Sequence, residues 1–222
     1  MDIKIIFEDK DILVVEKPPK LPCQSDKTSD EDLMSILNRP YLGLIHRLDR
    51  PVGGVMVYAK TKESNSFLSR EVSARRLYKE YLTIVCGSPS ETEGELRNYL
   101  KKLRTINMSK VVDEGTHGSK EAILQYKVLD TIDTEKYGTL TLLKIILKTG
   151  RHHQIRVQLS HAGLPIWGDN KYNKTFVKKK EWTQISLWSY KIGFNHPKSK
   201  EYVEFTSLPY EELPWEEFNI SD

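Results

Sequence analysis

The chain has 222 residues, 38% hydrophobic and 29% charged, which is enough to bury one core, so we predict a single domain over residues 1–222. Its 34 Lys and Arg against 31 Asp and Glu give a formal net charge of +3, so a polyanion would have to bind a local patch of cations. The two cysteines lie far apart in the sequence, which argues against a disulfide framework. The N-terminus has no basic leader, which argues against secretion, and no apolar run reaches about 18 residues, which argues against a membrane span. We therefore expect a cytoplasmic protein.

The first predicted elements are two strands that form a hairpin. Residues 3–7 and 12–15 are apolar, and the acidic stretch between them suits a turn. The next segment is rich in Pro and Ser and is predicted to be a loop, because proline cannot donate the backbone hydrogen bonds that helices and sheets need. The pattern then predicts a short helix over 30–37, a strand over 54–61 and a helix over 62–76.

The second half of the chain is mostly strand in pattern. Strands are predicted over residues 81–85, 184–194 and 201–207, and residues 93–132 mix short apolar runs with Gly-bearing turns. Residues 138–150 are rich in Leu and Ile, which predicts a strand buried on both faces. With few and irregularly placed helices and no repeat, this order predicts an α+β fold around a largely antiparallel sheet rather than a βαβ array.

One helix is predicted from its apolar spacing near the end of this half. Ile155, Leu159 and Ala162 recur at i, i+4 and i+7, and Gly163 suits a C-terminal cap.

A carboxylate between arginines marks the first candidate site. In LIHRLDRPVGG, Asp49 stands between Arg47 and Arg50, close to His46 and just before a predicted strand. Positive neighbours favour the ionised form, so we expect a carboxylate that can act as nucleophile, cation stabiliser or acceptor but poorly as general acid. The alternative is a structural salt bridge or a turn cap.

The second cluster is KTGRHHQIR, residues 148–156. Arg151 and Arg156 flank a Gly turn and a helix start, and guanidinium groups beside helix N–H groups can bind an anion. The tandem His152 and His153 suggest a metal, but no third ligand lies at a recognisable spacing and HExxH is absent, so we predict no metal site. The alternative is a polar, solvated helix start.

The third cluster is RRLYKEYLTIV, residues 75–85. A tyrosine between cations can stack on a base while the cations hold phosphates, as flipped nucleotides require. Tyr78 or Tyr81 could equally pack on the core with the hydroxyl outward. A further basic run over residues 178–180 is typical of a solvated face, with phosphate contact as the other interpretation.

Together and in this order, the clusters resemble the RluA family of pseudouridine synthases. HRLDRPVGGVMVYAKT is similar to the family's RLD motif, KEYLTIVCG to its Lys-x-Tyr strand, LKTGRHHQIRVQLSHAGLPIWGDNKY to its GRxHQIR motif with the Gly-Asp that follows, and DILVVEKPPKLP to its opening segment. The resemblance spans roughly residues 5–172. It implies the pseudouridine synthase fold, a central mixed and mostly antiparallel sheet flanked by helices and loops, with an active-site cleft across the sheet.

The resemblance also implies roles for individual residues. Asp49 corresponds to the nucleophile that attacks ribose C1′ of the target uridine, and Tyr81 to the residue that stacks on the flipped uracil and serves as a proton-transfer base. Arg156 corresponds to the partner of the catalytic carboxylate. RNA binding is assigned to Arg47, which braces the gap left in the RNA, and to Arg50, Lys79, Arg151 and His153, of which the last two are supporting, turn-fixing residues.

The implied reaction requires no cofactor and no metal, only a site that holds the detached uracil. Its substrate is a structured ribosomal or transfer RNA from which the uridine must be extruded. We expect neither DNA nor a membrane as partner, and a monomer. Because the predicted sheet begins at once, we expect no N-terminal S4 module, so the catalytic domain itself must recognise the RNA.

The chain departs from the family pattern at three places. Residues 52–54 are Val-Gly-Gly where many relatives have Thr-Ser-Gly, His152 stands where Ser or Thr is common, and Lys20 replaces the usual Gly. These changes leave the mechanism unchanged and concern the loop geometry and the RNA substrate.

Two other classes of function are weighed against this interpretation. One is a catalytically silent RNA-binding protein on the same fold, against which the presence of all the implied catalytic residues speaks. The other is a carboxylate glycoside hydrolase, which would need a second carboxylate that HRLDRPVGG does not supply.

Overall fold

A computed structural model describes residues 2–25, 30–179 and 182–220, which form two compact units. The first unit comprises residues 1–80 and 188–209, and the second residues 81–187 and 210–221. The chain passes from one unit to the other inside the strands β5 (Tyr78–Cys86) and β10 (Leu187–Asn195), and again after Pro209. The single domain predicted over the whole chain stays a prediction.

The first unit is a sheet with strand order β1-β2-β4-β10, in which β11 pairs with β10 and β3 with β4. Its β4–β10 pair is parallel, with Trp188 opposite Gly53, and the other registered pairs of this unit are antiparallel. Besides β5 and β10, the elements are β1 (Ile5–Glu8), β2 (Ile12–Lys17), α1 (Leu33–Leu37), β3 (Gly43–Leu44), β4 (Gly53–Ala59), α2 (Lys62–Ser73) and β11 (Tyr202–Thr206).

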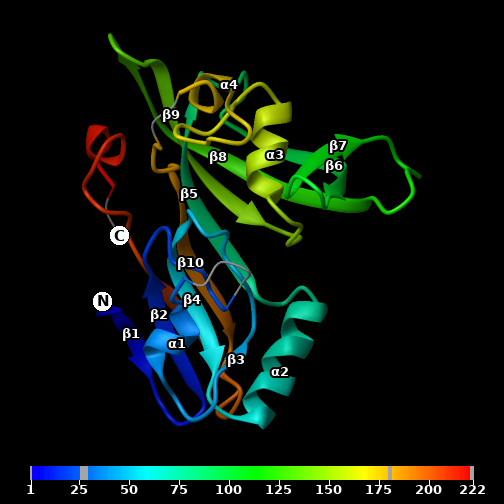
Figure 1. The fold of residues 1–222 in the computed structure, drawn as a ribbon, viewed down its shortest axis with the longest axis vertical. Coiled ribbons are helices and arrows are strands. Elements are labelled where there is room, and N and C mark those ends of the chain that lie inside the picture. The colour runs from blue at the N-terminus through cyan, green and yellow to red at the C-terminus, as the bar shows by residue number, and fades with distance from the viewer. Residues whose placement is uncertain (1, 26–29, 180–181, 221–222) are drawn as a thin grey trace. The chain divides into compact units, whose positions relative to one another are not determined.

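Helix α2 covers one face of this sheet (Figure 1). Leu68 of α2 packs into a core made by β2, β4 and β10, in which Val14, Val57 and Phe194 are wholly buried. The helix begins where Thr61 accepts a hydrogen bond from Ser64 N at 3.1 Å, as an N-cap residue does. These strands and helices confirm the predicted hairpin, the short helix, the strand before α2 and α2 itself, with ends shifted by up to three residues.

The second unit has the strand order β5-β9-β8-β6-β7. The registered pairs β6–β7, β6–β8 and β8–β9 are antiparallel. Besides β5, the elements are β6 (Glu93–Leu103), β7 (Met108–Val112), β8 (Lys120–Thr134), β9 (Gly138–Leu147), α3 (Gln154–His161), α4 (Lys174–Val177) and η1 (Trp215–Glu217). The registered pairs are thus mostly antiparallel, and the parallel β4–β10 pair makes the arrangement mixed, as predicted.

Residues 93–132 form longer strands than their sequence indicates. Strands β6 and β8 alternate exposed and half-buried residues over much of their length, because one face of these strands is polar. The apolar periodicity on which the prediction depends is therefore weak in β6 and β8. Strand β9 matches its prediction well, because residues 140–143 are buried without interruption.

Helix α3 lies across β6 and β8, where Val157 packs on Leu100 and Ala122 (Figure 1). Gly163 follows the helix with φ +81°, as a C-terminal glycine should. The predicted apolar stripe is wrong at Ala162, which is exposed at the C-cap. The buried residues surround the helix instead, because the segment lies inside the unit rather than on its surface.

Candidate active site

Asp49 opens a tight turn directly before β4. Its carbonyl oxygen accepts a hydrogen bond from Val52 N at 2.9 Å, which defines the Asp49 turn, residues 49–52. The Asp49 side chain is half-buried. The turn therefore presents this carboxylate just before the start of a wholly buried strand.

The two glycines after the turn have steric reasons to be glycine. Gly54 has φ +116°, and a Cβ there would lie 2.2 Å from the carbonyl oxygen of Ser189. A Cβ on Gly53 would lie 2.2 Å from the ring of Trp188. The absence of a Cβ at both positions therefore lets β10 approach the start of β4 closely.

A buried lysine contacts the main chain of the Asp49 turn. The Lys17 side chain is 0% exposed, and its ammonium donates to the carbonyl oxygens of Pro18, Leu21 and Arg50 at 2.8, 2.8 and 3.1 Å. Burial lowers the pKa of Lys17 to about 8, and the nearby charge of Asp49 works in the opposite direction. The lysine is thus an electrostatic neighbour of Asp49 and a clamp on the main chain beside it.

Two further side chains hold the residues around the turn. The Cys23 thiol contacts the backbone nitrogen and oxygen of Leu48, at 3.4 and 3.2 Å. The Arg50 guanidinium pairs with Asp30 and donates to Lys20 O at 2.9 Å. Lys20 has φ +70°, the left-handed conformation that favours glycine. Arg50, predicted to bind RNA, therefore also braces this loop.

The remaining predicted residues of the first unit differ in exposure. Arg47 is exposed, whereas Lys79 is half-buried and its pKa is lowered by desolvation. His46 accepts a hydrogen bond from Val57 N at 3.2 Å, and burial together with the charge of Lys79 lowers its pKa to about 3. His46 is therefore neutral at neutral pH.

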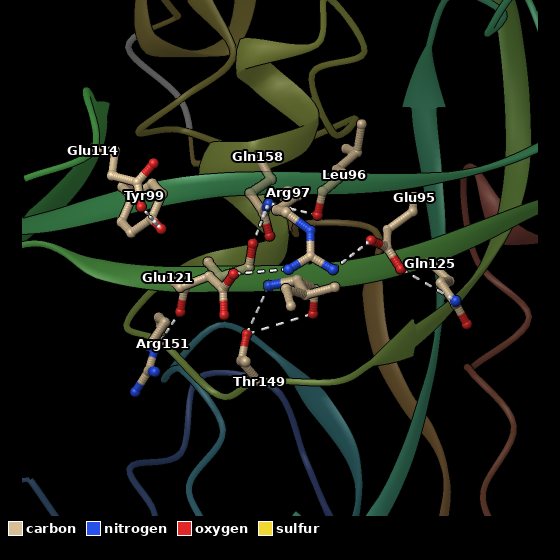
Figure 2. A network of polar contacts seen from close by, with 12 residues as sticks. Glu95, Leu96, Arg97, Tyr99, Glu114, Glu121, Gln125, Thr149, Arg151 and Gln158 are labelled. Atoms are coloured by element: carbon tan, nitrogen blue, oxygen red, sulfur yellow. Dashed lines mark hydrogen bonds and ion pairs between the residues drawn. The ribbon is translucent and has the colours of Figure 1, made fainter.

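Side chains of residues 148–156 attach this segment to β8 (Figure 2). Thr149 Oγ1 accepts from Ile123 N at 2.9 Å and donates to Gln154 Oε1 at 2.8 Å. Gln154 Nε2 donates to Ile123 O at 3.1 Å, and Arg151 Nε to Glu121 O at 2.8 Å. Arg151 thus has a turn-fixing contact of the kind that the resemblance implied.

Arg156 is held by a carboxylate to which the sequence assigned no role. Its Nε and Nη2 donate to Asp169 Oδ2 and Oδ1, at 2.9 and 2.7 Å, and the two side chains are 2% and 0% exposed. Asp169 Oδ1 also accepts from the main-chain nitrogens of Lys171 and Tyr172, at 2.8 and 3.1 Å. This bidentate pair fixes the plane of the guanidinium.

An aromatic cluster surrounds this pair. The Tyr172 ring lies 5.3 Å from the Arg156 guanidinium, and its hydroxyl bonds to His153 Nδ1 at 2.9 Å. His153 begins α3 with φ +54° and stacks on His152, with ring centroids 3.8 Å apart. Burial, then the charge of Arg156, lowers the pKa of His153 to about 2, so the ring is neutral. The alternative of a solvated helix start is wrong, since this start is buried.

The predicted site residues divide between the two units. The second unit brings His153 and Arg156 together around Tyr172, and it also contains Tyr81, which is buried in β5. Asp49, Arg47, Arg50 and Lys79 belong to the first unit, and Tyr81, Arg151, His153 and Arg156 to the second.

Sequence reasoning missed Lys17, Asp169 and Tyr172. A lysine at the end of an apolar strand is typical of a solvated strand end, and its burial depends on loops far along the chain. Asp169 and Tyr172 lie within the GRxHQIR match, so the Gly-Asp pair was a usable signal. Gly168 supports that tight turn, since its φ is +76° and a Cβ there would lie 2.1 Å from Gln184 O.

The described parts of the chain contain no group of three or more His, Cys, Asp or Glu residues placed to bind a metal ion. Within the same residues, no helix has the length and apolar character needed to cross a bilayer.

The chain is similar to known proteins over most of its length. The family described as RNA pseudouridylate synthase matches residues 11–161. An uncharacterized RNA pseudouridine synthase of Aquifex aeolicus is 36% identical over 91% of this chain and 68% of its own length, and YlyB of Bacillus subtilis, with the same description, is 30% identical over 92% and 68%. The tRNA pseudouridine synthase C of Haemophilus ducreyi is 29% identical over 94% of this chain and 91% of its own length. Human RNA Pseudouridylate Synthase Domain Containing 1 has the same fold, with a TM-score of 0.79 and 24% identity over 96% of this chain and 85% of its own.

Proposed function

Because the chain belongs to the RNA pseudouridylate synthase family, we propose that it isomerises specific uridines of ribosomal or transfer RNA with Asp49 as the nucleophile. The family membership confirms the RluA-type resemblance and an isomerase that acts on RNA. Relatives named for the large ribosomal subunit and for tRNA support these two RNA classes.

One observation carries the role of Asp49. A buried lysine clamps the main chain of its turn, so contacts to backbone atoms hold the carboxylate just before the start of β4. The Lys17 ammonium is an electrostatic neighbour of this carboxylate, whose charge acts to raise the pKa of the lysine against the effect of burial.

In the proposed reaction the Asp49 carboxylate attacks ribose C1′ of the target uridine. A bond from Asp49 to C1′ forms as the N1–C1′ bond breaks, and the uracil leaves as an anion, which turns until C5 faces C1′. The C5–C1′ bond then forms as the Asp49–C1′ bond breaks and its electron pair returns to the carboxylate, the C5 proton is lost to a base, and N1 is protonated, so atoms and charge balance. Tyr81 stacks on the uracil and takes part in proton transfer, and Arg156 supports the negative charge of the carboxylate.

RNA contact is proposed for Arg47, Arg50, Lys79, Arg151 and His153. Exposed Arg47 suits direct contact, whereas the buried His153 and the main-chain contact of Arg151 suit support of the α3 start. We further propose a monomer that does not use DNA and that needs no cofactor. Extrusion of the uridine costs a few kcal/mol, which stacking and phosphate contacts offset.

Release of tritium from RNA labelled at uridine C5 tests the proposal. Purified protein incubated with bulk ribosomal RNA and with unfractionated tRNA should release tritium into water, since C5 loses its proton only when the C–C link forms. Binding of these RNAs without any release would favour the catalytically silent alternative. Pseudouridine maps of total RNA with and without the gene would then give the positions.

A further inference from the structure

The β6–β7 hairpin, residues 93–112, carries exposed cations at its far end. Lys102, Arg104 and Lys110 are exposed around a turn in which Ile106 is 57% exposed and Asn107 has φ +49°. Strand β7 ends the strand order of its unit and pairs with β6 from Tyr99 to Leu103. A short edge strand such as β7 needs contacts in addition to its hydrogen bonds with β6 to keep the hairpin in one orientation.

Those contacts come from one histidine and the loop after α3. His152 Nε2 lies 3.0 Å from Asn107 Oδ1, and His152 Nδ1 lies 2.9 Å from Ser109 Oγ, which also donates to His152 O at 2.8 Å. Tyr172 OH accepts from Ser109 N at 2.7 Å, and Lys171 Nζ donates to Asn107 O at 2.9 Å. Both ring nitrogens of His152 therefore contact the hairpin.

The same histidine ring connects the hairpin to the α3 start. It stacks on His153, whose ring meets Tyr172 edge-on at 5.6 Å, and Tyr172 in turn lies over Arg156. Displacement of the hairpin turn would thus disturb a packed row of rings that ends at a proposed site residue.

A serine or threonine at position 152 could not make the bridge. A Ser or Thr hydroxyl lies one bond from Cβ and offers one oxygen, whereas the imidazole reaches Asn107 and Ser109 with two separate nitrogens. It would also offer no ring to stack on His153.

We propose that His152 is a positioning residue that clamps the turn of the β6–β7 hairpin to the start of α3, and so holds the cations of the hairpin in place for one RNA shape. The RNA part rests on the proposed function. The clamp acts on RNA affinity and RNA choice, not on the chemical step, because the described contacts of His152 lead to Arg156 through the rings of His153 and Tyr172.

Hydrogen exchange of the free protein, followed by mass spectrometry, tests the clamp without any RNA. Peptides that cover residues 101–112 should exchange at least about tenfold faster in His152→Ala and His152→Ser than in wild type, since hairpin opening is then opposed by fewer contacts. The matched control is His161→Ala, an exposed histidine at the other end of the same helix, which should leave that exchange unchanged. Unchanged exchange in both His152 variants would overturn the proposal.

Binding and kinetics test the role in RNA recognition. With bulk ribosomal RNA and unfractionated tRNA as probes, His152→Ala should weaken binding by about tenfold and reduce the slope of log affinity against log salt by up to about 2, because three cations lose their fixed placement. KM should rise by a similar factor and the saturated single-turnover rate should stay within about twofold. A rate loss without a change in KM or binding would overturn this role.

A triple variant tests whether His152 acts through the hairpin cations. In a background with Lys102→Ala, Arg104→Ala and Lys110→Ala, the further change His152→Ala should no longer weaken RNA binding. An undiminished effect there would refute the route through the hairpin. Absence of tritium release in wild type would refute the proposed isomerisation while the exchange and binding results still decide the clamp.

Discussion

The Asp49 turn and the α3 start each place one charged residue proposed to act on RNA, but they hold it in different ways. Around Asp49, the contacts of Lys17 and Cys23 reach main-chain atoms of neighbouring residues. At the α3 start, the contacts reach the Arg156 side chain itself, through a buried carboxylate and an aromatic ring.

This difference separates stability from reactivity in the two regions. A carboxylate on a turn that is held through its backbone can be changed at little cost to folding, because the turn keeps its clamp. A guanidinium fixed by a buried pair is rigid, but removal of its buried carboxylate partner is costly to folding. The following variants test that contrast, from the largest expected effect to the smallest.

Asp49→Asn should reduce turnover by at least about 10³-fold, because the amide is a poor nucleophile. RNA affinity should stay within a few fold and the free energy of unfolding within about 0.5 kcal/mol, since an amide of the same shape replaces a half-buried carboxylate. Tritium release, filter binding and urea melts give the three values. Measurable isomerisation by this variant refutes the assignment.

Asp169→Asn should lower the free energy of unfolding by about 3 kcal/mol or more, because Arg156 keeps its charge in a buried place. Glu121→Gln, which removes a partner of the exposed Arg97, is the matched control and should cost less than about 1 kcal/mol. Equal costs in chemical denaturation would contradict the contrast.

Arg156→Lys should recover only part of the rate that Arg156→Ala loses, since an ammonium cannot form the bidentate pair.

Lys17→Met should lower the free energy of unfolding by about 2 kcal/mol, because three carbonyl oxygens lose their donor inside the unit. It should also slow turnover more than it weakens RNA binding, since the turn that presents Asp49 loses its clamp. Lys10→Met, at an exposed lysine of the β1–β2 turn, is the control. A variant that keeps full stability and full rate would show that the clamp is dispensable.

The pH dependence of stability should report the same lysine. Its folded pKa of about 8 lies below the ordinary value of 10.5, so between these pH values the unfolded chain holds a proton that the folded chain has lost. The wild-type free energy of unfolding should therefore rise relative to Lys17→Met as pH increases through this window, by at most about 1.4 kcal/mol per pH unit. A difference that stays flat from pH 8 to 10.5 contradicts a charged, buried Lys17.

Local patterns in the sequence were sufficient for most elements of the first unit and for α3. The hairpin, α2 and β9 were predicted because their apolar spacing and turn residues are local properties. The three strands over residues 93–132 were not separated, because their polar face hides the period on which such a prediction depends. Asp49 and Arg156 were singled out from motif resemblance, and their roles stay predictions.

By itself the sequence determined the family, the mostly antiparallel α+β fold and the pair of motifs that contain the proposed site. Only the tertiary structure decided that Lys17 is a buried clamp, that Asp169 pairs with Arg156 and that His152 holds the β6–β7 hairpin. The physical reason is separation along the chain, since the contacts of Lys17 with Arg50, of Arg156 with Asp169 and of His152 with Asn107 join residues 13 to 45 positions apart. Burial and hydrogen bonding between such residues are set by packing, which no local pattern of residue types encodes.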